Sequence, residues 1–315
     1  MAETVEHEPL RIIEAITPPH QSTIIFLHGR GDNGNNVAPF LVYTPINSDH
    51  SETSRRNKDI TLRHLLPHTK FIFPTSLKRR FERLRNDIVF NQWFDIDSLD
   101  ITDYYDDGQV EGIKESTDYI HELIEAEVEA GTPPEKIVIM GLSQGCATGA
   151  VAVIRYPVRL GGFVGMSGWL PFITEIEDIF KKEGEEEEGD ATAVLGYIEK
   201  RLGSDKEVSP ENVREMLKTP VFIGHGVGDT KIRPKCGERL KDVMKAMKFE
   251  EVVWATYRVG HWWCDEELIH IAAWLGAKGF SVNGLEQFME DSIGSLSTQE
   301  DLFHFVHANF TDSLY

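Results

Sequence analysis

Three side chains in this sequence have the types and the spacing that nucleophilic acyl transfer needs. Ser143 stands in the pattern GLSQG at 141–145, Asp229 closes a glycine-rich stretch, and His261 follows a β-branched run. A serine hydroxyl becomes a nucleophile when a histidine takes its proton, and a carboxylate orients and stabilises that histidine. We therefore predict that Ser143, Asp229 and His261 form a catalytic triad that needs no metal ion and no cofactor.

The surroundings of Ser143 predict a sharp turn between a strand and a helix. A mostly apolar run at 136–140 leads straight into GLSQG, and small residues follow at helical spacing. Such a turn strains the serine backbone and exposes the hydroxyl at the carboxyl end of the sheet, and glycines at 141 and 145 leave the necessary room. The backbone N–H of Gln144 then lies at a helix N-terminus, where it can face an oxyanion. The alternative is a tight turn in which Ser143 merely caps the helix.

The expected acid and base each follow a predicted strand. Asp229 comes after residues 221–224, and His261 comes after residues 251–257. Serine, acid and histidine then occur in the chain order of α/β-hydrolases. An ordinary loop or helix-capping aspartate is the alternative for Asp229. His225, on the same loop, is expected to make structural hydrogen bonds rather than to act in catalysis.

The elements that must position these residues alternate along the chain. Short β-branched or aromatic runs alternate with amphipathic stretches, which is typical of a mostly parallel sheet with helices on both faces. The predicted strands are 24–27, 70–73, 137–140, 162–166, 221–224 and 251–257. The predicted helices are 111–130, 144–155, 234–247 and 265–277. The expected fold class is therefore α/β.

Composition limits the partners and the compartment. The chain carries 32 basic and 52 acidic residues, a formal net charge of −20, so phosphate backbones and anionic membranes repel it and nucleic acid is a poor partner. Three cysteines without zinc-site spacing indicate a reducing compartment. The N-terminal stretch lacks signal-peptide features and no run of about 18 apolar residues occurs, so we expect a cytoplasmic protein without stable membrane insertion.

Length and pattern favour one domain with additions. We predict a single α/β-hydrolase domain at 1–278, with insertions at about 45–60 and 173–209 and a short helix at 193–202. An acidic extension follows at 279–315. We expect part of it to dock on the domain because it carries many apolar residues, which are Leu285, Phe288, Met289, Leu302, Phe303, Phe305, Val306 and Phe310.

A glycine-rich turn after the first predicted strand offers a second oxyanion donor. It runs through LHGRGDNG and contains Arg30. In lipases and esterases a loop at the corresponding place lends a backbone N–H to the oxyanion. Glycine-rich loops also cradle phosphates, but the histidine and the missing Gly-Lys pair disfavour that alternative here.

Seven motifs in sequence resemble the acyl-protein thioesterase family, also called the phospholipase/carboxylesterase family of α/β-hydrolases, over about 22–277. They are FLHGRGDNG, FPTS at 73–76, QWFDI at 92–96, GLSQG, SGWLP at 167–171, HGVGD at 225–229 and VGHWW around His261. The resemblance implies the α/β-hydrolase fold and the triad already expected. It also implies that the backbone N–H groups of Arg30 and Gln144 bind the oxyanion.

The resemblance further implies that Trp93, Trp169 and Leu170 lie close to the substrate's acyl group. Plain core packing is an equally good interpretation for Trp93. The chain departs from the family pattern at Arg30, where leucine is usual, at Cys146, where glycine is usual, and at the two tryptophans after His261. With its acidic insertion and extension, it resembles a fungal-type or otherwise divergent member.

The function expected from these observations is a serine hydrolase that cleaves carboxylic ester or thioester bonds through an acyl-enzyme. The substrate classes that the resemblance implies are small esters, lysophospholipids and S-acylated proteins. Two alternatives stay open, namely a non-catalytic binding protein with the same fold and a hydrolase of lactones or peptides. Nothing in the sequence selects the acyl length or the oligomeric state.

Overall fold

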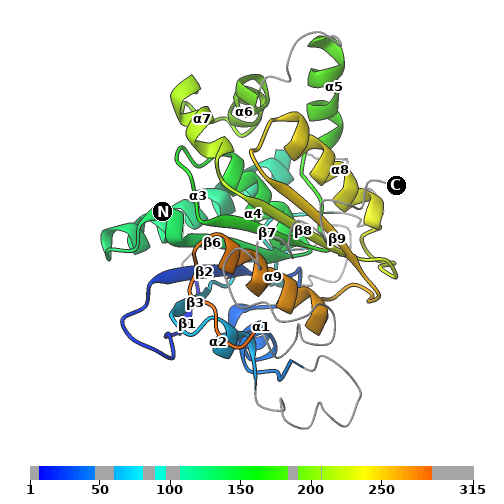
Figure 1. Ribbon diagram of the computed structural model, residues 1–315. Helices are drawn as coiled ribbons and strands as arrows, with labels where there is room; N and C mark the ends of the chain where they lie inside the picture. Colours follow the sequence, from blue (N-terminus) through cyan, green and yellow to red (C-terminus); the bar gives the residue numbers. More distant parts are fainter. Residues whose placement is uncertain are drawn as a thin grey trace, which may run out of the picture.

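A mostly parallel sheet forms the centre of the molecule (Figure 1). The computed structural model describes residues 7–46, 60–80, 89–96, 107–183, 191–206 and 208–285. Within these ranges the main sheet has the order β1-β3-β2-β6-β7-β8-β9. Its strands are β1 (Arg11–Ile13), β2 (Ser22–Leu27), β3 (Thr69–Phe73), β6 (Ile137–Leu142), β7 (Gly162–Met166), β8 (Val221–Gly226) and β9 (Val252–Tyr257). Neighbouring strands are parallel except at the edge, where β1 pairs antiparallel with β3.

The burial of each strand follows from its place in the sheet. Every residue of β2, β3, β6, β7 and β8 is buried, as expected of parallel strands with both faces covered. Strand β9 lies at the edge, and only every second residue of it is buried. All six strands predicted from the sequence are present, and β1 is the additional one in this sheet.

Helices cover both faces of the sheet and create two apolar cores (Figure 1). One face carries α1 (Gly34–Val42), α2 (Leu62–Leu65) and α9 (Asp265–Ala277). The other carries α3 (Asp107–Glu129), α4 (Gln144–Ile154) and α8 (Pro234–Ala246). The four predicted helices are therefore confirmed, as is the α/β fold class. The sequence did not predict α1 and α2.

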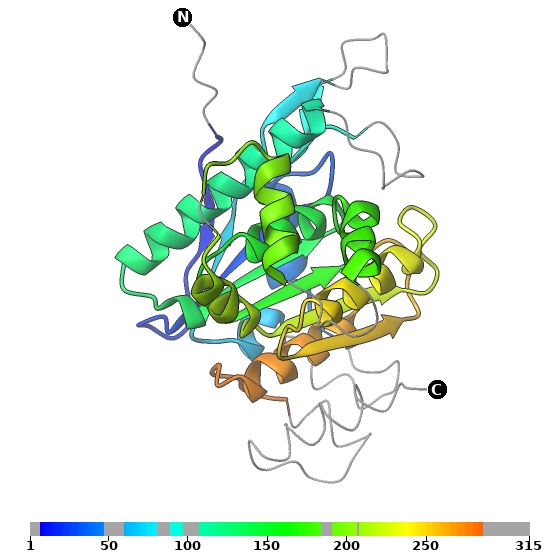
Figure 2. The same cartoon turned by 90° about the horizontal axis from the view of Figure 1, so that it is seen from above.

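A small hairpin lies outside the main sheet. Strands β4 (Lys78–Arg80) and β5 (Val89–Asn91) pair antiparallel with each other. Seen from above, the hairpin lies beside the N-terminal part of α3 (Figure 2). There Arg79 forms an ion pair with Glu115 of α3. Gly112 of α3 packs closely against the backbone of Phe94, since a Cβ atom on Gly112 would lie 2.9 Å from the Phe94 Cα. The hairpin thus fixes the segment that leads to Phe94.

Three helices make the crossover between β7 and β8. They are α5 (Ile173–Glu183), α6 (Ala191–Arg201) and α7 (Pro210–Leu217). The predicted short helix at 193–202 corresponds to α6. Helix α5 is attached to α8 by a two-point contact, in which the Arg239 guanidinium donates to the Glu177 carboxylate at 2.8 and 3.0 Å. The two helices that fall within the predicted insertion, α5 and α6, thus belong to the helix layer on this face.

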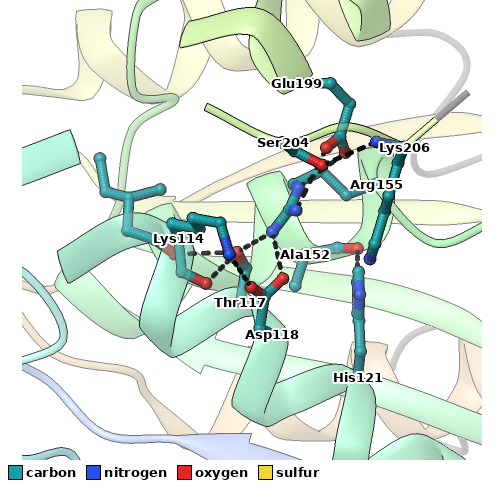
Figure 3. Close-up of polar contacts among 10 residues, drawn as sticks. Lys114, Thr117, Asp118, His121, Ala152, Arg155, Glu199, Ser204 and Lys206 are labelled. Carbon is teal, nitrogen blue, oxygen red and sulfur yellow. Dashed lines mark hydrogen bonds and ion pairs between the residues drawn. The ribbon is translucent and has the colours of Figure 1, made fainter. Parts of the chain in front are cut away.

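A buried ion pair attaches α6 to α4 (Figure 3). Arg155, the C-cap of α4, donates from Nε and Nη2 to the two carboxylate oxygens of Glu199 at 2.8 and 3.2 Å. Its Nη1 donates to Asp118 on α3 at 3.0 Å and also contacts Thr117. Burial raises the pKa of Glu199, but the Arg155 guanidinium, with smaller contributions from Ser204 and Lys206, holds that pKa below its ordinary value. The pair is therefore charged and joins three helices.

The first residues of the C-terminal extension pack on the domain. Phe280 and Leu285 are buried in the core beneath α2 and α9, and the Asn283 N–H donates to the Leu65 carbonyl at 3.0 Å. The rest of the predicted extension (286–315), most of the first insertion (47–59) and the glutamate run (184–190) lie outside the described residues. The domain division stays a prediction. In the described ranges no helix is long and apolar enough to cross a lipid bilayer.

Candidate active site

The turn between β6 and α4 holds Ser143 in a strained backbone conformation. Its φ and ψ angles are +57° and −119°, outside the regions that non-glycine residues ordinarily occupy. A Cβ atom on Gly145 would lie 2.1 Å from the Leu27 carbonyl oxygen, and one on Gly141 would lie 2.4 Å from the Gly145 carbonyl oxygen. Ser143 occupies the N-cap position, but its hydroxyl makes no capping hydrogen bond. The turn therefore aims the hydroxyl away from the helix.

The Ser143 hydroxyl points to His261 instead. The Ser143 Oγ lies 2.9 Å from the His261 Nε2, and the His261 Nδ1 lies 2.7 Å from the Asp229 Oδ2. Because an ionised carboxylate only accepts, Nδ1 carries the proton and Nε2 is free to accept the serine proton. The Asp229 Oδ1 accepts from the backbone N–H groups of Lys231 and Ile232 at 2.9 and 3.0 Å. The three side chains thus have the geometry that proton transfer from serine requires.

Close backbone packing holds the acid loop against the histidine loop. A Cβ atom on Gly226 would lie 2.3 Å from the Gly260 carbonyl oxygen, so only glycine fits there. The Gly228 N–H donates to the Val259 carbonyl at 3.0 Å. These contacts fix the relative positions of two loops that are distant in sequence, and they do so at the carboxyl ends of β8 and β9.

His225 supports the acid loop, in the structural role that the sequence favoured. Its Nε2 donates to the Ile232 carbonyl at 2.9 Å and lies 3.4 Å from the Asp229 Oδ2. The ring is fully buried, and burial lowers its pKa despite the nearby Asp229 carboxylate. His225 is therefore neutral, and it does not reach Ser143 through any hydrogen bond in the described structure.

The glycine-rich turn after β2 lies against Ser143. A Cβ atom on Gly29 would lie 3.6 Å from the Ser143 Cβ. His28 anchors this turn, because its Nε2 accepts from the Ser76 N–H at 3.0 Å and its Nδ1 donates to the Gly29 carbonyl at 2.7 Å. Burial lowers the pKa of His28 to about 4, so the ring is neutral with the proton on Nδ1. The indole N–H of Trp93 donates to the His28 carbonyl at 2.8 Å.

The side chain of Gln144 connects the nucleophile turn to the segment around Trp93. Its Oε1 accepts from the Trp93 N–H at 3.0 Å, and its Nε2 donates to the Phe94 carbonyl at 2.6 Å. The sequence assigned a role only to the Gln144 backbone and missed this one, as it missed the anchoring by His28. The sequence offered one signal for the role of the Gln144 side chain: it is a large polar residue between the small residues Ser143 and Gly145.

The three residues expected near the acyl group are all buried. Trp93 and Leu170 have no exposed surface and Trp169 has 1 %. The Trp169 ring lies edge-on to Phe94, with 6.2 Å between centroids. The indole N–H of Trp93 finds its partner in the His28 carbonyl, as the N–H of a buried tryptophan usually does, so core packing stays open for this residue. An acyl-binding role for the three stays a prediction.

Arg30 lies along the hairpin strand β5. Its guanidinium is 4.9 Å above the Phe90 ring, and its Nε donates to the Gln92 Oε1 at 3.2 Å. The neighbouring Gly31 N–H donates to the Asn91 carbonyl at 2.8 Å. The departure from leucine at Arg30 therefore gives the glycine-rich turn additional contacts with the segment 90–92.

A serine, a histidine and an aspartate joined at the carboxyl edge of a mostly parallel sheet define the class as a serine hydrolase of the α/β-hydrolase fold. A family model described as phospholipase/carboxylesterase matches residues 57–185. The chain is 31 % identical over 258 residues to acyl-protein thioesterase 1 of Yarrowia lipolytica, covering 81 % of this chain and 91 % of that protein. It is 26 % identical to carboxylesterase SOBER1 of Arabidopsis thaliana, covering 80 % and 88 %.

A crystal structure of acyl-protein thioesterase 2 from Zea mays is similar in fold, with a TM-score of 0.57 and 25 % identity over 86 % of this chain and 98 % of that one. The chain belongs to the phospholipase/carboxylesterase family of α/β-hydrolases. It is a serine hydrolase that acts on carboxylic ester or thioester bonds.

Proposed function

We propose that Ser143, His261 and Asp229 carry this activity in two acyl-transfer steps. The His261 Nε2 takes the Ser143 proton while Oγ attacks the acyl carbon, and the same proton then passes to the leaving alcohol or thiol. Water, deprotonated by His261, releases the acid from the acyl-enzyme, and Oγ recovers the proton. Asp229 keeps the proton on Nδ1 and stabilises the imidazolium. The observation that carries the proposal is the continuous hydrogen-bonded chain of 2.9 and 2.7 Å from serine to aspartate.

Backbone N–H groups of Arg30 and Gln144 are proposed to stabilise the oxyanion. Gln144 is the first residue of α4, where the helix dipole favours negative charge. The turn that carries Arg30 packs against the nucleophile through Gly29. Donors fixed in this way lower the barrier because they need no reorganisation when charge develops.

The proposed substrates are acyl esters and thioesters, and among them S-acylated proteins, lysophospholipids and small esters. The names of the relatives, acyl-protein thioesterase and carboxylesterase, support this range. Trp93, Trp169 and Leu170 are proposed to form the apolar surroundings of the acyl group. We also propose a cytoplasmic protein with one catalytic domain at 1–278, which agrees with the three free cysteines.

A fluorophosphonate probe tests the nucleophile. The wild-type protein should be labelled, and Ser143→Ala should abolish labelling because the probe bonds to an activated serine oxygen. Ser209→Ala is the matched control, since Ser209 precedes α7 and makes no capping hydrogen bond through its side chain. An unlabelled wild-type protein, or labelling that survives in Ser143→Ala, would contradict the proposal.

The same variants distinguish an enzyme from a binding protein that has kept the fold. Turnover of a short p-nitrophenyl ester that disappears in His261→Ala would exclude the binding protein. A panel of matched esters and thioesters of increasing chain length, with lactones and peptides alongside, then identifies the acyl class.

A further inference from the structure

A buried carboxyl group lies behind the loop that carries the proposed general base. Glu267 is in the first turn of α9 and has 1 % of its surface exposed. Its carboxyl accepts a hydrogen bond from the backbone N–H of Cys264, the N-cap of α9. Cys264 follows His261 by three residues. The carboxyl therefore holds the end of the histidine loop.

The same carboxyl presses on the strand that leads to the proposed acid. A Cβ atom on Gly224 would lie 2.0 Å from the Glu267 Oε1, so the oxygen occupies the space that any other side chain would fill. Gly224 lies in β8, five residues before Asp229. Among the described residues, Oε1 has no hydrogen-bond partner. One buried group thus touches both the root of the acid loop and the end of the histidine loop.

We propose that Glu267 is a positioning residue of the triad: its carboxyl group sets the separation between the Asp229 loop and the His261 loop. The inference rests on the proposed roles of Ser143, Asp229 and His261. It explains why a carboxyl stays in an apolar setting with one oxygen unpaired, where a hydrocarbon side chain would cost less.

The surroundings favour the neutral form of this carboxyl. Burial raises the pKa of Glu267 to about 8, and the single Cys264 N–H lowers it only in part. The facing titratable groups are neutral at pH 7 apart from one exposed carboxylate, so none of them stabilises negative charge on Glu267. They are the Cys264 thiol, the Tyr257 phenol, the His270 ring bonded to that phenol, the Cys146 thiol and the exposed Glu266.

A pH dependence of catalysis follows. As the pH rises through about 8, Glu267 loses its proton, and a buried unpaired charge then lies against Gly224 and the histidine loop. The charge is stabilised only if the loops move apart to admit water, and such movement separates His261 from Ser143. The wild-type kcat should therefore fall at alkaline pH, by up to about tenfold for each pH unit above this value.

Glu267→Gln tests the inference, because the amide keeps the shape and the hydrogen bond to Cys264 but does not titrate. With a short p-nitrophenyl ester at pH 6 to 10, it should retain kcat at pH 7 within about threefold and lose the alkaline decline. Glu267→Asp withdraws the carboxyl by one methylene, and it should lower kcat by about tenfold or more with little change in KM. Glu266→Gln, on the exposed side of the same turn, is the matched control and should keep the wild-type profile.

The rate of fluorophosphonate labelling of Ser143, measured over the same pH range, should reproduce each profile without ester turnover. An alkaline decline that persists unchanged in Glu267→Gln would overturn the inference, as would a wild-type kcat in Glu267→Asp. Both outcomes would leave Ser143-dependent labelling intact, so they differ from a failure of the proposed triad. Circular dichroism of each variant checks that it is folded.

Discussion

The room available to a side chain limits which residue can stand near Ser143, as much as the chemistry does. Cys146, where the family pattern has glycine, shows how the chain accommodates a departure. A Cβ atom on Gly168 would lie 2.5 Å from the Cys146 Sγ, and one on Gly165 would lie 2.8 Å from it, so two glycines make room for the sulfur. Burial raises the pKa of this thiol to about 12, and it is therefore unreactive. The sequence located the cysteine but not the glycines that receive it.

The strongest steric prediction at this scale concerns Gly145. Gly145→Ala should destabilise the protein by about 2 to 4 kcal/mol and abolish probe labelling, because the added methyl group would meet the Leu27 carbonyl and displace Ser143. Gly196→Ala in α6 is the matched control, since the added methyl group would meet no atom within 4 Å apart from the backbone of its own helix. It should stabilise the protein by about 0.5 to 1 kcal/mol. Urea unfolding measures both effects, and equal stabilities for the two variants would refute the argument.

At the scale of elements, the sequence predicted every strand of the main sheet except β1, and five helices, namely α3, α4, α6, α8 and α9. Strands such as β6 are continuous apolar runs, and that pattern depends only on burial. It did not predict α1, because the helix contains Pro39 and begins at a glycine. Tertiary contacts stabilise it instead, since a Cβ on Gly34 would lie 2.2 Å from the Phe73 carbonyl oxygen and the Gly34 N–H donates to Thr75 at 3.0 Å. Helix propensity depends on the local sequence alone, so it cannot predict a helix that such contacts stabilise.

The meeting of Ser143, Asp229 and His261 was predictable because each of them follows a strand. Their loops could be ordered along the chain and assigned to one edge of the sheet. The side chains that hold these loops in place could not be predicted. His28, the Gln144 side chain and Glu267 act through contacts between segments that are distant in sequence. A polar residue in an apolar stretch indicates a buried contact, but the partner becomes apparent only in three dimensions.

The attachment of α6 gives a prediction at the element scale (Figure 3). Glu199→Ala leaves the fully buried Arg155 side chain without its two-point partner, and it should cost about 3 to 5 kcal/mol of unfolding free energy. Asp178→Ala, which removes the exposed ion pair with Lys181, should change the free energy of unfolding far less, because water and salt screen such a pair. Ester turnover should change little, because Arg155 and Ser143 lie at opposite ends of α4. A Glu199→Ala cost no larger than that of Asp178→Ala would contradict the prediction.

The direction of the Glu199 pKa shift adds a check on this pair. Its folded pKa is held below the ordinary value of a glutamate, so its contribution to stability is present above that ordinary value. The contribution is lost as the pH falls through the folded pKa. The stability difference between wild type and Glu199→Ala should therefore shrink in acid, and urea unfolding at pH 4 and pH 7 measures it.

The fold of the whole molecule brings Ser143, Asp229 and His261 together from three distant segments of an acidic chain. Parallel strands end at one edge, so residues 143, 229 and 261 meet although as many as 118 positions separate them. Near this edge Trp262 is 39 % exposed and stacks on Trp263, with the exposed Phe40 ring edge-on to it. The rim of the site is therefore apolar, while the chain as a whole has a formal net charge of −20.

This combination predicts how salt acts on substrates of different charge. A long-range negative potential lowers the local concentration of anionic substrates, and salt screens that potential over about 10 Å at 0.1 M. Raising NaCl from 10 to 300 mM should therefore increase kcat/KM for an anionic ester, such as a p-nitrophenyl hemisuccinate, by a few fold. The neutral p-nitrophenyl acetate is the matched control and should change little. An equal response of the two esters would contradict the prediction, because it would mean that no net negative potential reaches the site.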